Sequence, residues 1–133
     1  MKIIVDTNIL ISAIIRDRNP EKLILWVIKN KHEWIVTSQI LNEYISVLKR
    51  KKFNLSDQLS NYWIELILTA TRKIDTNTNI IFKRDQKDSI FIECLLSSNS
   101  DYFVTGDRDF EDYDDILRER IIKLSDFIEK YLF

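Results

Sequence analysis

The chain has 133 residues, and its 20 Lys and Arg against 21 Asp and Glu give a formal net charge of −1. This near-neutral balance excludes a protein whose whole surface is basic and clamps nucleic acid. With 45% hydrophobic residues and only 1 Gly and 1 Pro, the composition is that of a globular domain without a flexible linker. We therefore expect one domain over residues 1–133, long enough to bury its own core.

The apolar segments and the cysteine content indicate in which cellular compartment the protein lies. Every apolar run is too short to span a bilayer, and the first residues lack the long apolar region of a signal peptide. The single Cys94 has no partner for an internal disulfide, which fits a reducing environment. We expect a cytoplasmic protein with no membrane partner.

Strand-like and helical patterns alternate along the chain. In chain order, we expect a strand at 2–6, helices at 8–16 and 20–30, a strand at 33–37, helices at 38–51 and 56–73, a weak strand at 73–76, a helix at 88–98, strands at 101–105 and 120–125, and a helix at 126–133. Continuous apolar strands interleaved with helices are typical of a parallel sheet covered on both faces. The predicted fold is a three-layer α/β/α sandwich around a parallel sheet of about five strands.

Acidic side chains lie where the carboxyl ends of these strands are expected, which is where open α/β sheets bind ligands. Asp6 ends the first strand, Gly106 and Asp107 follow the fourth, and Glu43 lies in the helix after the second strand. Asp88 precedes the apolar stripe of its own helix by helical spacings, so we expect it on the face that packs on the sheet.

Each acid also has a structural interpretation. Asp6 would serve as a helix N-cap, Glu43 as a solvated flank, Asp88 as part of an amino-terminal cap, Asp107 as a turn residue, and residues 109–115 as an acidic surface loop. Converging carboxylates repel one another unless a cation lies among them. The coincidence of several acids at one sheet edge therefore favours a metal site.

The residue types also indicate which metal and which chemistry. Carboxylate oxygens favour Mg²⁺ or Mn²⁺, whereas zinc would need His and Cys, and the chain has one of each, His32 and Cys94, in unrelated positions. Glycine-rich phosphate loops and a calcium-binding loop are absent from the sequence. Carboxylates with a divalent metal and no histidine base predict metal-assisted hydrolysis, commonly of phosphodiesters.

Three segments in this order resemble the PIN domain family, namely IIVDTNILISAI, SQILNEY and RDQKDSIFIECLLSSNSDYFVTGDRDF. Within the family they are most similar to the VapC-like ribonucleases, the toxin components of toxin–antitoxin systems. The resemblance covers essentially the whole chain. It implies a five-stranded parallel sheet and a Mg²⁺- or Mn²⁺-dependent endoribonuclease that hydrolyses single-stranded or structured RNA.

By position, the resemblance implies roles for particular residues. The acidic quartet that binds metal and carries catalysis would be Asp6, Glu43, Asp88 and Asp107. The residues that orient this site from outside would be Asn8, Thr105 and Asp109. The implied partners are an RNA substrate, a cognate antitoxin protein and a second copy of the chain in a homodimer.

Two further features have competing interpretations. The basic segment Lys49, Arg50, Lys51 and Lys52 is either a solvated helix end or a set of contacts to the RNA backbone, and we expect it far from the sheet edge. Gly106 is expected to provide a sharp turn that points Asp107 into the cluster.

Two other functions compete with the nuclease. One is a catalytically silent PIN-like module that binds RNA or protein. The other is a haloacid dehalogenase-type phosphatase, which would need a second aspartate at the position of Asn8.

Overall fold

The apolar runs form five parallel strands in one sheet, which confirms the predicted fold class. The computed structural model describes residues 1–15, 18–76, 86–106 and 115–132, and of residues 86–88 and 115–116 it describes the backbone. The sheet order is β3-β2-β1-β4-β5. The strands are β1 (Lys2–Val5), β2 (Glu33–Val36), β3 (Thr71–Lys73), β4 (Tyr102–Thr105) and β5 (Ile121–Lys123).

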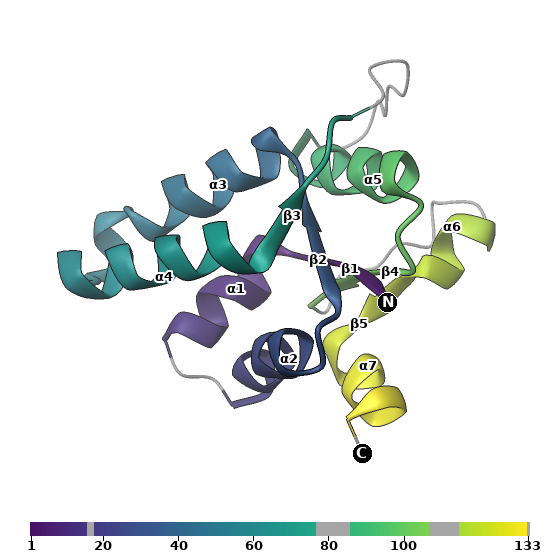
Figure 1. Ribbon diagram of the computed structural model, residues 1–133, viewed down its shortest axis with the longest axis horizontal. Helices are drawn as coiled ribbons and strands as arrows, with labels where there is room; N and C mark the ends of the chain where they lie inside the picture. The colour runs from purple at the N-terminus through teal and green to yellow at the C-terminus, as the bar shows by residue number, and fades with distance from the viewer. Residues whose placement is uncertain (16–17, 77–85, 107–114, 133) are drawn as a thin grey trace.

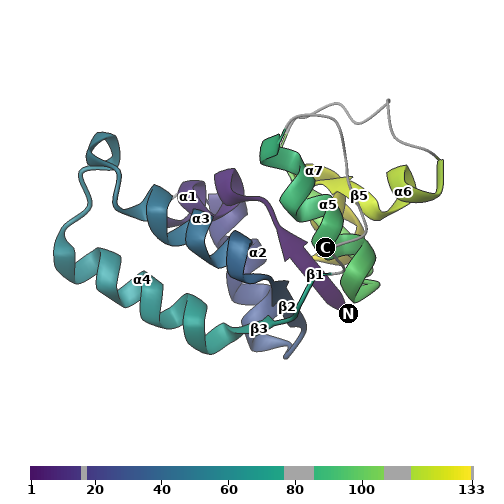
Figure 2. The same cartoon turned by 90° about the horizontal axis from the view of Figure 1, so that it is seen from above.

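Helices cover both faces of this sheet (Figures 1 and 2). They are α1 (Thr7–Ile14), α2 (Arg18–Lys29), α3 (Ser38–Leu48), the short 3₁₀ helix η1 (Lys51–Phe53), α4 (Asp57–Ala70), α5 (Gln86–Ser98), α6 (Asp115–Arg120) and α7 (Leu124–Tyr131). Neither η1 nor α6 was predicted from the sequence.

Consecutive aromatic residues of β4 show which helix covers which face. The ring of Phe103 stacks on Phe91 of α5, with centroids 5.1 Å apart, whereas Tyr102 contacts Phe127 of α7 at 5.7 Å. Neighbouring side chains of a strand point to opposite faces, so α5 and α7 lie on opposite sides of the sheet. Trp26 of α2 contacts Phe127, which puts α2 on the α7 side.

The strands are buried because both faces are covered. Ile3, Ile4 and Val5 of β1 are fully buried, as expected of a continuous apolar run. The helical period of α5 predicts an apolar face at Phe91, Ile92, Leu95 and Leu96, but Leu96 is exposed and Cys94 is buried instead. Burial raises the pKa of the Cys94 thiol to about 12, which keeps it protonated at neutral pH.

The third strand and the carboxyl-terminal elements differ from the prediction. Helix α4 ends at Ala70, and Thr71 takes an extended backbone and pairs with Trp34 of β2, so β3 lies at 71–73 instead of 73–76. The Thr71 hydroxyl donates to the Ile67 carbonyl at 2.7 Å, which satisfies one of the last helical carbonyls. The last strand is shorter than expected, and α7 begins at Leu124.

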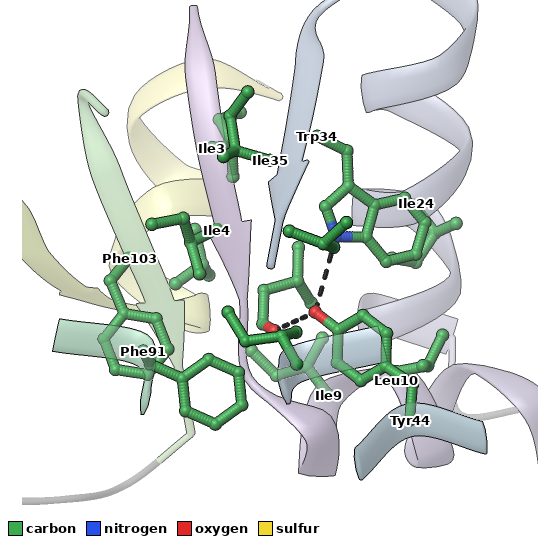
Figure 3. Close-up of a cluster of buried hydrophobic side chains, with 14 of the residues drawn as sticks. Ile3, Ile4, Ile9, Leu10, Ile24, Trp34, Ile35, Tyr44, Phe91 and Phe103 are labelled. Atoms are coloured by element: carbon green, nitrogen blue, oxygen red, sulfur yellow. Dashed lines mark hydrogen bonds between the residues drawn. The ribbon is translucent and has the colours of Figure 1, made fainter. Parts of the chain in front are cut away.

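A buried tyrosine joins α3 to the end of β1 (Figure 3). The ladder between β1 and β2 pairs only Lys2 with Glu33 and Ile3 with Trp34. Beyond it, the Tyr44 hydroxyl donates to the Val5 carbonyl and accepts from Trp34 Nε1 at 3.4 Å. Burial raises the pKa of Tyr44, so its hydroxyl remains a donor. This side chain therefore continues the contact between β1 and the β2–α3 segment where the ladder stops.

Among the described residues, no helix has the length and apolar character needed to cross a membrane.

We predict that Tyr44→Phe lowers the free energy of unfolding by about 1–3 kcal/mol, because two buried polar groups lose their partner. Urea denaturation monitored by circular dichroism measures this change. The matched control is Tyr62→Phe on α4, where the side chain is 61% exposed and the expected change is below about 0.5 kcal/mol. Equal stability of the two variants would show that the Tyr44 hydroxyl does not hold β1.

Candidate active site

Asp6 lies directly after β1 and connects that strand to β4. Its backbone N–H donates to the Val104 carbonyl at 3.0 Å, and its side chain is only 2% exposed. Oδ2 accepts a hydrogen bond from Thr105 Oγ1 at 2.7 Å. Asp6 is also the N-cap of α1, but the bond from the Asn8 N–H to Oδ1 is long, at 3.4 Å. The capping interpretation therefore accounts for only part of its environment.

Glu43 reaches the same place from α3. The helix begins after Thr37, whose hydroxyl accepts from the Ile40 N–H at 3.2 Å, and Glu43 follows within the second turn. Glu43 is half-buried, and its Oε2 accepts a hydrogen bond from the hydroxyl of buried Thr7. Because Thr7 is the residue after Asp6, this bond fixes one acid relative to the other.

Thr7 is a residue of the pocket that sequence reasoning missed. From the sequence alone it had no assigned role in the site. Its hydroxyl instead donates across 36 positions to Glu43. The one sequence feature that could have indicated a role for Thr7 is its place next to an acid at a strand end. That feature does not show which residue accepts the hydrogen bond of Thr7.

These side chains line a pocket of about 260 Å³. Its lining residues are Asp6, Thr7, Asn8, Glu43, Val47, Arg50, Lys52, Phe53 and Phe91. We call Asp6 and Glu43 the acidic pair, and we call Arg50, Lys52 and Phe53 the rim. The lining also includes the buried apolar side chains of Val47 and Phe91.

The expected position of the basic segment is wrong for two of its four residues. Helix α3 ends at Leu48, and Arg50 has an extended backbone with φ −68° and ψ 133°. The chain then turns into η1, which brings Arg50 and Lys52 to the pocket of the acidic pair. Lys49 and Lys51 are exposed and do not line that pocket.

The other expected site residues are described to different extents. Asp88 lies in the first turn of α5, and its side chain is outside the described residues, as are Asp107 and Asp109. Phe91 of the next turn of α5 lines the pocket, so this end of the helix borders it. The Asn8 side chain is exposed, and its expected orienting role stays a prediction because the side chains of Asp88 and Asp107 lie outside the described residues.

Gly106 lies at a bend directly after β4, and the expectation that it points Asp107 into the cluster stays a prediction. The φ of Gly106 is not positive, and no atom of the described residues lies within 4 Å of the place where a Cβ would stand. Neither strain nor close approach therefore requires glycine at this position. Gly106 lines a second pocket with Asn8, Pro20 and Leu124.

The acidic pair has the chemistry of a partial site for a hard divalent cation. Two carboxylates from different elements line one pocket, and Asp6 is almost fully buried. Such oxygens suit Mg²⁺ or Mn²⁺, which are bound through a few carboxylates while keeping several waters. Within the described ranges, no group of three His, Cys, Asp or Glu side chains comes together.

A parallel five-stranded sheet with acids at the carboxyl end of its central strand defines a class of α/β protein with a polar site at that edge. The family model described as the PIN domain matches residues 2–109. The chain therefore belongs to the PIN domain family, whose members are generally nucleases and typically use divalent metal ions.

A solved structure shares the fold. A chain of the crystal structure of VapBC2 from Rickettsia felis, bound to a DNA fragment from their promoter, superimposes with a TM-score of 0.61. The match covers 92% of this chain and 97% of that chain, at 16% sequence identity. A comparison with curated proteins found no match.

We predict that Thr105→Val lowers the free energy of unfolding by about 1.5–3 kcal/mol, because the buried Asp6 carboxylate loses a hydrogen bond to a charged acceptor. Valine matches threonine in shape, so no cavity adds to the loss. Chemical denaturation measures it, and Thr105→Ser should retain most of the stability. The matched control is Thr69→Val, whose exposed hydroxyl bonds only to its own helix at Glu65. An equal effect at both sites would contradict the assigned bond.

Proposed function

We propose that the chain is a metal-dependent endoribonuclease that hydrolyses phosphodiester bonds of RNA. The observation that carries this proposal is the convergence of Asp6 and Glu43 in one pocket of a PIN domain. In the proposed site, Asp88 and Asp107 add the further carboxylates, and Asp109 lies outside them. Mg²⁺ or Mn²⁺ bound to these acids would supply an activated water and shield the charge that develops on the phosphate.

The described residues of this site have positioning roles. Thr105 and the Asn8 N–H hold the Asp6 carboxylate from one side, which leaves oxygen lone pairs free toward the pocket. Thr7 holds Glu43 in the rotamer that faces the same space. The apolar side chains of Val47 and Phe91 would exclude water from their part of the pocket. Together these contacts preorganise the acids before substrate binds.

We further propose that the nuclease is the toxin of a toxin–antitoxin pair, acts in the cytoplasm and forms a homodimer. The fold shared with a chain of the VapBC2 complex supports this role. Exposed apolar side chains on two helices offer surface for an antitoxin or a second copy: Leu25 and Ile28 on α2, and Leu59, Tyr62 and Leu68 on α4.

The nuclease is tested with a labelled, mixed-sequence single-stranded RNA in Mg²⁺, Mn²⁺ or EDTA. We expect cleavage that requires metal and falls by at least about 100-fold in Asp6→Asn and in Glu43→Gln, since losing even an outer partner of a metal site costs about 10–100-fold. Glu65→Gln, at an exposed position of α4, is the matched control and should cleave at the wild-type rate.

Cleavage that survives EDTA or the Asp6→Asn substitution would contradict the proposal. A folded wild-type protein that binds metal and RNA without cutting would contradict it as well, and would favour the silent binding module.

Metal binding is tested separately by thermal unfolding. At a metal concentration about 100-fold above Kd, binding stabilises the folded state by about 2.7 kcal/mol, which corresponds to a Tm increase of roughly 8 °C for a chain of this size. We expect this increase with Mn²⁺ for the wild type and for Glu65→Gln. Asp6→Asn and Glu43→Gln should lose most of it, and an unchanged shift in both would exclude the acidic pair as ligands.

A further inference from the structure

The rim carries two cations beside the acidic pocket. Arg50 and Lys52 are exposed, and neither forms an ion pair with any residue in the described part of the chain. Both nevertheless line the pocket of Asp6 and Glu43. Cations that line an acidic pocket without forming ion pairs with its carboxylates can bind an anion that enters the pocket.

Phe53 gives the rim an aromatic surface. Its ring is half-buried and packs partly against the hydrophobic core, while the ammonium of Lys52 lies 5.0 Å from the ring centroid. Asn54 follows in the left-handed region with φ 47° and ends η1, so the ring lies on a short turn held between α3 and α4. A ring face that already attracts a cation is also a surface on which a nucleobase can stack.

The spacing along α3 separates the rim from the reacting end. The last residue of α3, Leu48, lies five positions after Glu43, which is about 8 Å of axial rise, and the rim follows. The pocket of about 260 Å³ is also smaller than the ~300–1,000 Å³ typical of sites that enclose a whole small ligand. The pocket therefore suits one part of a polymer, with the rest of the polymer outside the pocket.

Resting on the proposed function, we infer that the rim is a nucleotide subsite for single-stranded RNA beside the scissile phosphate. One unpaired base stacks on Phe53 in the place that Lys52 occupies over the ring. The displaced Lys52 ammonium and the Arg50 guanidinium then contact phosphates of the same strand. A paired base has no free face to offer, so the subsite selects unpaired RNA.

The subsite is tested by binding, without cleavage. Fluorescence anisotropy in EDTA measures the affinity of the wild type for a labelled single-stranded RNA octamer and for the same octamer in a duplex. We expect the single strand to bind more tightly. Phe53→Leu keeps an apolar side chain on the core but removes the stacking face, and should weaken single-strand binding by about 5- to 100-fold. Trp63→Leu is the control, because Trp63 is a half-buried aromatic of α4 that packs partly against the core and does not line the pocket, and this variant should bind as the wild type does.

The charge contacts are tested by the salt dependence of the same binding. Arg50→Gln with Lys52→Gln should reduce the slope of log K against log salt by about 1.4, because two phosphate contacts are lost from a single strand. Lys22→Gln with Lys29→Gln removes the same charge from exposed positions of α2 and should leave the slope within about 0.3 of the wild type. Equal slopes for the two double variants would overturn the charge contacts.

The outcomes separate this inference from the proposed function. Binding that depends on Phe53 and favours the single strand supports the subsite, even if no variant cuts RNA. Metal-dependent cleavage whose kcat/KM is the same in Phe53→Leu and in the wild type leaves the nuclease intact and overturns the subsite. Equal affinity for single strand and duplex overturns it as well.

Discussion

Two side-chain hydroxyls hold the end of β1 against α3, and the site depends on them. The ladder between β1 and β2 pairs two residues of β1 and then stops, so the backbone alone does not fix where α3 lies. The Tyr44 hydroxyl donates to the Val5 carbonyl, and the Thr7 hydroxyl donates to Glu43. These bonds join the residues on either side of Asp6 to Glu43 and its neighbour. The bond of Tyr44 is buried and that of Thr7 is partly buried, so together they limit how far the two acids can move apart.

Charge in the pocket is divided between its two ends. The acidic pair lies at the carboxyl end of β1, and Arg50 and Lys52 lie beyond the end of α3 without forming ion pairs among the described residues. Because no direct ion pair in the described part of the chain joins the two groups, the carboxylates and the cations each keep their own capacity to bind a ligand. The acidic end can take a metal and the other end a phosphate, which is the arrangement that a nuclease of an anionic polymer needs.

The parallel sheet and the position of Asp6 could be predicted because they depend on local sequence. A continuous apolar run followed by an acid predicts a buried strand with an acid at its end, and the structure has both. The wrong predictions lie where contacts between distant residues determine the structure. Thr71 is not part of α4 because it pairs with β2. Thr7 donates its hydrogen bond to Glu43, which lies on α3, the helix after the next strand. The extended backbone of Arg50 turns the basic segment back to the pocket, which no helical period indicates. Gly106 lies at a bend, but its φ is not positive, so the bend itself does not demand glycine. Lone residue types are therefore weaker signals than patterned segments.

The central claim is that Asp6 and Glu43 are held together as ligands of one divalent cation. An anomalous difference map from crystals grown with Mn²⁺ tests it most directly. The account predicts a peak in the pocket, within about 2.5 Å of a carboxylate oxygen of both acids, with the Thr7 and Thr105 hydroxyls still bonded to them. A peak that contacts neither acid, or a Glu43 side chain turned away from Asp6, would contradict it.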